Sequence, residues 1–165
     1  MFYKGFNKIF KNKKGISVVE LLVVVVIISV GLVALLNAVT SSLKFSRLMK
    51  ENDQAKELAQ EALEAVRSFR DGTTWDTNGL GTLTLSVPYH PQKTSDIPPK
   101  WNLVLLKETI GIFTRKVVFE SVFRDSNSNI VLVGGIVDSN TRKVTATVSW
   151  QGKTVEISTY LTNWR

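Results

Sequence analysis

The feature that most constrains this chain is an uninterrupted apolar stretch near its N-terminus. Residues 16–36 hold 21 positions, and all are apolar or glycine except Ser17, Glu20 and Ser29. A helix of about 20 apolar residues crosses the hydrocarbon core of a bilayer. Because backbone groups in lipid must be hydrogen-bonded internally, so long a run forms a helix, although its many valines would suit a strand in water. The sequence therefore predicts a membrane helix over Ile16–Leu36.

The residues ahead of this stretch are basic and carry most of the chain's charge. The formal charge is +7, but without the five lysines before Gly15 there remain 16 basic and 14 acidic residues, a net +2. These lysines are Lys4, Lys8, Lys11, Lys13 and Lys14. Lysines beside a membrane helix favour the cytoplasmic side, so the C-terminal part is expected outside. A nucleic-acid partner stays open, but no basic groove interleaved with aromatics supports one.

A glycine junction, Gly15-Ile16, stands before the apolar stretch instead of after it, where a secretory signal has its cleavage site. The order KKGISVVELL, from Lys13 to Leu22, resembles the N-terminal motif of the type IV prepilin family, with Ile16 where phenylalanine is commoner and Val19 where isoleucine is commoner. The resemblance implies that a prepilin peptidase cuts after Gly15 and that Ile16 is N-methylated. It also implies assembly with other pilin subunits through an inner-membrane platform, after a stage in membrane lipid.

Glu20 is the one carboxylate inside the apolar stretch. A charged side chain at the centre of a membrane helix costs about 2.5–3.5 kcal/mol and less near the interface, so it needs a partner or a purpose. The resemblance implies that Glu20 pairs with the Ile16 amino group of a neighbouring subunit and sets the register between subunits. Ser17-Val18-Val19-Glu20 also fits a helix capping box, and the two roles do not exclude each other.

The apolar pattern continues past the membrane stretch as an amphipathic repeat. Leu48, Ala55, Ala62 and Phe69 recur every seven residues, charged residues including Glu51 occupy the other side, and Asp71-Gly72 is a helix stop. One helix over residues 16–70 is predicted; the alternative is a membrane helix, a Thr-Ser-Ser hinge and a second helix.

The C-terminal part reads as strands. After an elaborated connection over residues 73–99, in which one alternating run at 80–87 is a weaker strand candidate, stronger strands are predicted at 113–123 and 130–137. A hairpin is predicted for 143–150 and 154–162 across Gln151-Gly152-Lys153. Its apolar face needs cover, which the seam of Leu58, Ala62, Val66 and Phe69 offers. The expected fold is α+β, a long N-terminal helix with an antiparallel sheet packed on it, divided into a leader (1–15), a membrane helix (16–38), an amphipathic continuation (39–71) and an extracellular sheet domain (72–165).

No pattern of residues suggests catalysis, a cofactor or a metal. Asp125–Asn129 alternates oxygen ligands but lacks the glycine and distal glutamate of a calcium loop, so it is predicted to be a turn, as is Asp138–Thr141. His90 is placed in a loop without catalytic partners. The four tryptophans, Trp75, Trp101, Trp150 and Trp164, are expected mostly in the core; the alternative is a platform that binds a carbohydrate or a surface. The chain has no cysteine, so its outward domain is predicted to fold without disulfides.

Two further segments, Ala59–Trp75 and Val144–Arg165, resemble minor pilins of the pilus-modification kind. The resemblance implies a minor pilin or pseudopilin that leaves the cytoplasmic membrane for an extracellular filament, and it does not separate pilus, secretion pseudopilus and DNA-uptake filament. The alternative is an uncleaved single-pass membrane protein that presents an extracellular ligand-binding domain.

Overall fold

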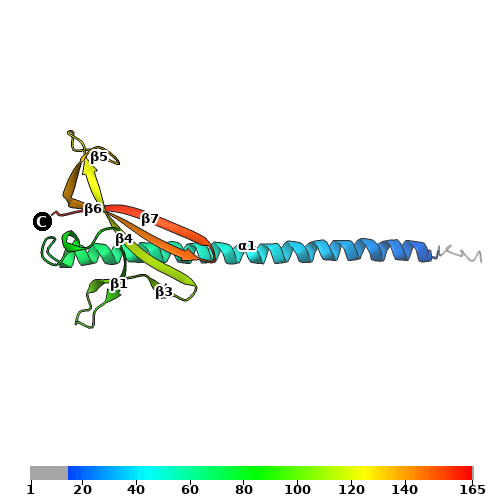
Figure 1. Cartoon of the computed structure of the whole chain (residues 1–165). Coiled ribbons are helices and arrows are strands. Elements are labelled where there is room, and N and C mark those ends of the chain that lie inside the picture. The colour runs from blue at the N-terminus through cyan, green and yellow to red at the C-terminus, as the bar shows by residue number, and fades with distance from the viewer. Residues whose placement is uncertain (1–14, 165) are drawn as a thin grey trace, which may run out of the picture. The chain divides into compact units, whose positions relative to one another are not determined.

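The computed structural model describes residues 15–164 and contains one long helix followed by an antiparallel sheet (Figure 1). The α+β arrangement predicted from the sequence is confirmed. The elements are α1 (Val18–Gly72), the 3-10 helix η1 (Leu80–Thr82), β1 (Pro88–Lys93), β2 (Trp101–Leu105), β3 (Glu108–Ile110), β4 (Phe113–Arg124), β5 (Ile130–Val131), β6 (Ile136–Trp150) and β7 (Lys153–Thr162).

Helix α1 is continuous through the Thr-Ser-Ser segment where a hinge was the alternative. It ends at Gly72, at the stop that the sequence predicts, and the Thr73 hydroxyl donates to the Phe69 carbonyl oxygen at 2.7 Å. The described residues fall into two compact units, 15–47 and 48–164, of which the second is the sheet unit. In the first unit α1 is exposed throughout, whereas from Glu51 onward it has a buried face.

The sheet has the strand order β2-β1-β4-β6-β7, and β3 and β5 also pair with β4. Every pairing is antiparallel. The predicted hairpin is confirmed with a shorter turn, since Trp150 pairs with Lys153 across Gln151 and Gly152. Both turn residues have positive φ, 44° and 75°, as a two-residue hairpin turn that follows the twist of its strands requires.

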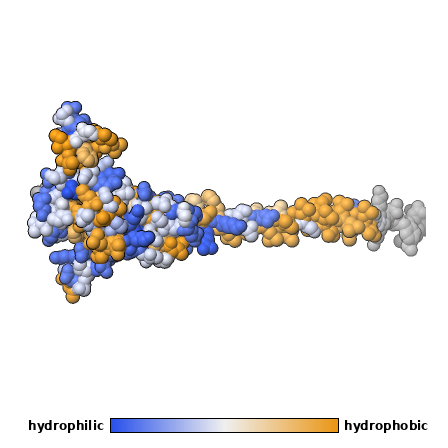
Figure 2. Space-filling model, in the orientation of Figure 1, coloured by the Kyte–Doolittle hydropathy of each residue, from blue (hydrophilic) through white to orange (hydrophobic). Residues whose placement is uncertain are grey.

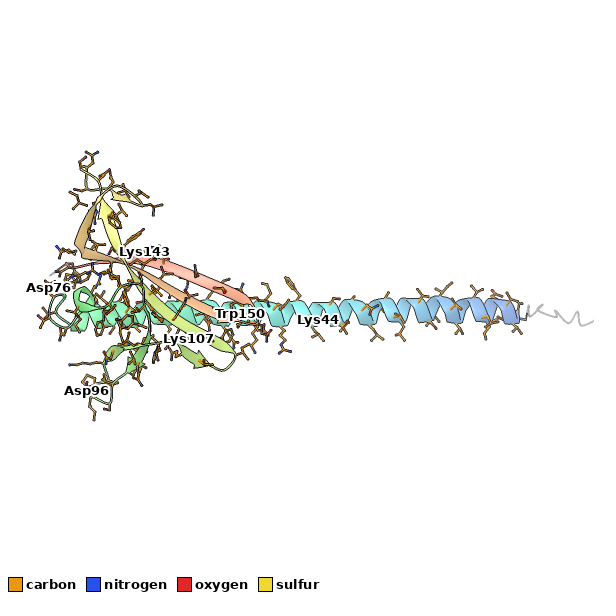
Figure 3. All side chains as sticks on the ribbon, viewed as in Figure 1. Lys44, Asp76, Asp96, Lys107, Lys143 and Trp150 are labelled. Atoms are coloured by element: carbon orange, nitrogen blue, oxygen red, sulfur yellow. The ribbon has the colours of Figure 1, made fainter. Side chains whose placement is uncertain are left out.

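The core lies between the C-terminal half of α1 and one face of the sheet. Alanines of α1, among them Ala55, Ala59 and Ala62, are completely buried, and their small side chains let the sheet approach the helix closely. The sheet contributes larger side chains, such as Phe119, and Figure 3 shows Trp150 at the hairpin end of β6 beside α1. Burial of each large apolar side chain contributes about 1.5–3 kcal/mol. The seam predicted for α1 is confirmed, because Ala62, Val66 and Phe69 are buried and Leu58 packs against them.

A buried arginine fastens the sheet to the helix. The Arg115 side chain on β4 is only 4% exposed. Its guanidinium donates to the Leu58 carbonyl oxygen and to Glu61 Oε2 on α1, both at 3.1 Å, and to Glu108 Oε1 on β3 at 2.7 Å. One cation therefore satisfies a helix carbonyl and holds two carboxylates that would otherwise repel each other.

We expect Arg115→Met to lower the stability of the sheet unit by about 1–3 kcal/mol, because the carbonyl and the two carboxylates lose a charged donor while the buried volume stays similar. The measurement is thermal unfolding of the full chain in detergent, followed by the fluorescence of the buried Trp75 and Trp150. Arg67→Met is the matched control, since Arg67 pairs with Glu64 on the exposed side of α1 and should matter by less than about 0.5 kcal/mol. Equal melting temperatures for Arg115→Met and wild type would contradict the fastening role.

Several sequence predictions about strands are wrong. Residues 80–87 form η1 and turns instead of a strand, and the 73–99 connection contains β1. Strands β2 and β3 were not predicted either. His90 lies in β1 and not in a loop, where its Nδ1 is 3.0 Å from the Leu106 carbonyl oxygen. The strand predicted at 130–137 is interrupted, because β5 ends at Val131 and β6 begins at Ile136.

The turn predicted at Asp138–Thr141 is instead a break in register inside β6. Val122 of β4 pairs with Asp138 of β6, while the adjacent Ser121 pairs with Arg142. Residues 139–141 of β6 therefore bulge from the ladder. Asp138 holds this bulge: its Oδ2 accepts from Arg124 Nε and from the Thr141 hydroxyl, each at 2.7 Å. The turn predicted at Asp125–Asn129 is confirmed between β4 and β5.

The Arg124 hydrogen bond, followed by that from Thr141, lowers the pKa of Asp138 below its ordinary value of 3.8. A lowered folded-state pKa stabilises the fold at pH values above 3.8, and this stabilisation is lost as the pH falls through the folded-state pKa. We expect Asp138→Asn to lower the melting temperature by a few degrees at neutral pH. Below about pH 4, the difference in melting temperature between the variant and wild type should become smaller. Asp53→Asn, which removes an exposed carboxylate of α1, is the control. A gap that stays constant from neutral to acidic pH would contradict this role.

Candidate processing and assembly segment

The junction Gly15-Ile16 lies just ahead of α1, which starts at Val18. Gly15 is exposed, and a Cβ added to it would meet no atom within 4 Å. Ile16 is 73% exposed. The peptide bond between them is therefore outside the helix and open to an enzyme that needs an accessible backbone.

Glu20 occupies the first turn of α1, four residues after Ile16. The first turn is formed, since the Leu21 N–H donates to the Ser17 carbonyl oxygen at 3.1 Å. A carboxylate here interacts favourably with the positive end of the helix dipole. Among residues 15–164, however, neither the side-chain bonds of a capping box nor an ion pair engages Glu20. The exposed carboxylate is thus left available for a group from outside this part of the chain.

The first half of α1 exposes its apolar side chains, and Figure 2 shows them along the visible face of this segment. It is long enough and apolar enough to cross a membrane, and none of the span is buried inside the structure. The Ser29 hydroxyl, which lies inside the apolar stretch, is hydrogen-bonded, since Ser29 Oγ donates to the Val25 carbonyl oxygen at 2.7 Å. Water is an unfavourable environment for so much apolar surface, so this segment needs lipid or other apolar helices around it.

The structure brings Gly15, Ile16 and Glu20 into one short segment, as sequence reasoning predicts. Lys13 and Lys14 lie outside the described residues.

Within residues 15–164, no group of three or more His, Cys, Asp or Glu side chains could hold a metal. Asp125 of the calcium-like run is occupied by its own loop: Oδ1 accepts from the Asn127 and Asn129 N–H groups, and bonds of this kind, chiefly that from Asn129, lower its pKa.

Sequence reasoning missed two exposed features of the sheet unit. Trp164 was expected in the core with the other tryptophans, yet it is 61% exposed and lines a pocket at the C-terminal end of α1. The segment between β5 and β6 carries exposed apolar side chains, including Leu132 at 87% and Val133 at 88%. The only sequence signal that Trp164 is exposed was its position after the last predicted strand. The paired glycines Gly134-Gly135 were a signal that the predicted strand at 130–137 is interrupted.

The comparisons with known proteins agree with the N-terminal geometry. Residues 10–36 match the family model described as the prokaryotic N-terminal methylation motif, which is the type IV prepilin signature. The resemblance noted from the sequence is therefore confirmed at this motif. No curated protein matches the chain, and no solved structure matches it.

Proposed function

We propose that this chain is a minor pilin or pseudopilin, a structural subunit of a type IV pilus-like filament. In this proposal a prepilin peptidase removes residues 1–15 on the cytoplasmic side, and Ile16 becomes the methylated N-terminus. The subunit then leaves the membrane and joins other pilins through the first half of α1. The methylation motif supports a type IV pilin-like precursor, and the long apolar helix with this motif indicates membrane anchoring.

The observation that carries the proposal is the motif placed directly before a helix that exposes apolar side chains on all sides. A membrane anchor alone needs such a helix, but it does not need a glycine junction before the helix or a carboxylate in its first turn. A filament subunit needs all three, because the same helix must lie first in lipid and later among identical or related helices.

Glu20 supplies the polar contact in this arrangement. Removal of residues 1–15 would create an amino group on Ile16. Within residues 15–164, the Glu20 side chain makes no hydrogen bond or ion pair that could occupy it. Within a bundle of apolar helices, a charge is tolerated when it is paired, so the Ile16 amino group of one subunit and the Glu20 carboxylate of the next would offset each other's desolvation cost. Such a pair forms at one axial offset between helices and thereby sets the register.

The assignment as a minor subunit is the finer part of the proposal and rests on the resemblance of Ala59–Trp75 and Val144–Arg165 to pilus-modification subunits. In the sheet unit, the residues of the strands that alternate inward are buried against α1 of the same chain. The unit can therefore be carried as a finished domain on the helix, outside the membrane.

The proposal is tested by locating the chain in its native host with and without the prepilin peptidase. We expect the chain in sheared surface filaments of the parent strain and only in the membrane fraction of the peptidase-deficient strain. An unrelated membrane protein, followed in parallel, reports contamination of the sheared fraction. Retention of the chain in the membrane of both strains would contradict a filament role.

A further inference from the structure

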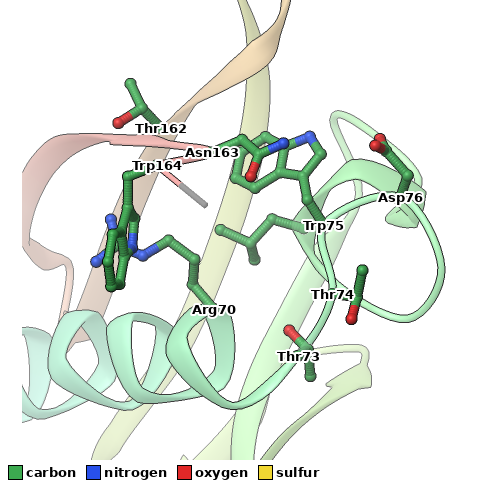
Figure 4. A pocket seen from close by; sticks show the side chains of 9 residues that line it. Arg70, Thr73, Thr74, Trp75, Asp76, Thr162, Asn163 and Trp164 are labelled. Carbon is green, nitrogen blue, oxygen red and sulfur yellow. The ribbon is translucent and has the colours of Figure 1, made fainter.

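A pocket of about 330 Å³ opens at the C-terminal end of α1, where three segments of the sheet unit meet (Figure 4). They are the last turns of α1, the loop that follows it and the end of β7. The lining residues are Arg70, Thr73, Thr74, Trp75, Asp76, Leu80, Thr162, Asn163 and Trp164. The volume lies within the range of small-molecule sites, about 300–1,000 Å³.

One wall of the pocket is rigid. Trp75 is buried, and its Nε1 donates to the Ser139 carbonyl oxygen at 3.2 Å. The Arg142 guanidinium lies 5.7 Å from the centre of the Trp75 ring, and Gly81 packs so closely that an added Cβ would come within 2.6 Å of Trp75. The wall is therefore fixed before any ligand arrives.

The opposite wall is an exposed indole. Trp164 follows β7 and is 61% exposed, and the preceding Asn163 is anchored to Asn140 by a backbone hydrogen bond of 2.8 Å. Figure 4 shows the Arg70 side chain extending toward Trp164. Trp164 already has an interaction within the chain, and its exposed part presents an apolar surface at little conformational cost.

The polar groups around the pocket are mixed and nearly charge-balanced. The lining includes one guanidinium, Arg70, and one carboxylate, Asp76, together with threonine hydroxyls and the Asn163 amide. Arg70 Nε donates to Asp71 Oδ1 at 3.0 Å, so part of its charge is already offset. A phosphate or carboxylate ligand would meet only one partly neutralised cation, and a purely apolar ligand would leave several polar groups without partners.

We propose that this pocket binds a saccharide, with a pyranose ring stacked on Trp164. A pyranose combines one apolar face of C–H groups with a rim of hydroxyls that both donate and accept. The indole matches the face, while a carboxylate, an amide and a guanidinium match neighbouring hydroxyls, each by two parallel bonds. This inference does not depend on filament assembly.

The test is saturation-transfer NMR on the full chain with methyl pyranosides of glucose, galactose, mannose and N-acetylglucosamine as probes. The chain is held in an amine-oxide detergent, because glucoside and maltoside detergents present pyranose headgroups of their own. We expect transfer to the ring C–H protons of at least one probe. Trp164→Ala should weaken its binding by about tenfold or more.

Trp101→Ala is the matched control, since Trp101 is a partly buried tryptophan of β2 under the Lys93 ammonium and does not line the pocket. It should bind the probe as wild type does. Asp76→Ala is a second pocket variant at an exposed loop position, and it decides the matter if Trp164→Ala lowers the melting temperature. Absence of transfer to all four probes, or wild-type affinity in both pocket variants, would overturn the proposal.

Discussion

Gly15→Leu should leave the uncleaved chain, with residues 1–15 attached, as the form recovered from the membrane. Gly15 is exposed and has open space around its Cα, so a leucine side chain fits there without disturbing the fold. The expected effect is on recognition: a peptidase that closes on the backbone at the scissile residue has no room for a branched side chain where glycine offers none. Mature chain should fall to a trace, as measured by intact mass of the membrane-extracted protein.

The matched control for this variant is Gly5→Leu, which places the same side chain at another glycine among the basic residues but away from the motif. It should be processed like wild type. Normal maturation of Gly15→Leu would show that the cut lies elsewhere, and the proposed start at Ile16 would then be wrong.

Glu20→Ala should insert into the membrane and be processed, but it should be depleted from sheared filaments by about tenfold or more. Insertion should not suffer, because the substitution removes a charge that is costly in lipid. Assembly should suffer because the Ile16 amino group of a neighbouring subunit would be left among apolar helices without a counter-charge. Glu20→Gln, which keeps the size and removes the charge, should behave in the same way.

The comparison for these variants is Glu64→Ala, which removes an exposed carboxylate that pairs with Arg67 elsewhere on α1. The ratio of filament to membrane protein should be unchanged in this control. Equal ratios for wild type and both Glu20 variants would contradict the register role and leave the helix dipole as the reason for a carboxylate at this position.

The parts of the fold that follow from periodicity were predictable from the sequence. The heptad repeat predicted the buried face of α1 correctly at Ala55, Ala62 and Phe69 but not at Leu48, which is 46% exposed. Strict alternation from Val144 to Trp150 predicted the buried face of β6. The glycine at 152 marked the hairpin. These signals are local, so no knowledge of the other elements was needed to read them.

Other strand assignments were wrong because the local sequence signals favoured a different structure. Pro88 and Pro91 argue against a strand at β1, since proline donates no ladder hydrogen bond. The strand tolerates them because Pro88 is its first residue and Pro91 lies beyond Pro88 and Tyr89, the two residues of β1 that pair with β4. The run at 80–87 alternates like a strand, but it joins no strand in a ladder of the sheet. Its Thr84 N–H instead bonds the Tyr89 hydroxyl at 3.1 Å, and its Ser86 N–H bonds the Phe119 carbonyl oxygen at 2.9 Å.

Tertiary context also changed the environment of single residues. Glu51 was predicted on the charged side of α1, but it lies four residues before Ala55 on the buried face; it is only 7% exposed, with Oε2 3.8 Å from Lys153 Nζ of the hairpin. Arg115 has the same phase as the buried Phe113 and Val117 of β4, and three acceptors from α1 and β3 allow its charged side chain to be buried there. The prepilin motif could be recognised from the sequence because it is linear, whereas the Trp164 pocket joins residues more than ninety positions apart and could be found only from the fold.

Intact mass and N-terminal sequence test most directly whether the chain is a processed filament subunit, as we propose. The protein is taken from membranes and from sheared surface material of its native host. We expect a surface form that starts at Ile16 and carries one added methyl group on its amino nitrogen. A surface-exposed form that starts at Met1 and keeps residues 1–15 would contradict the account and favour an uncleaved membrane protein presenting an extracellular ligand-binding domain.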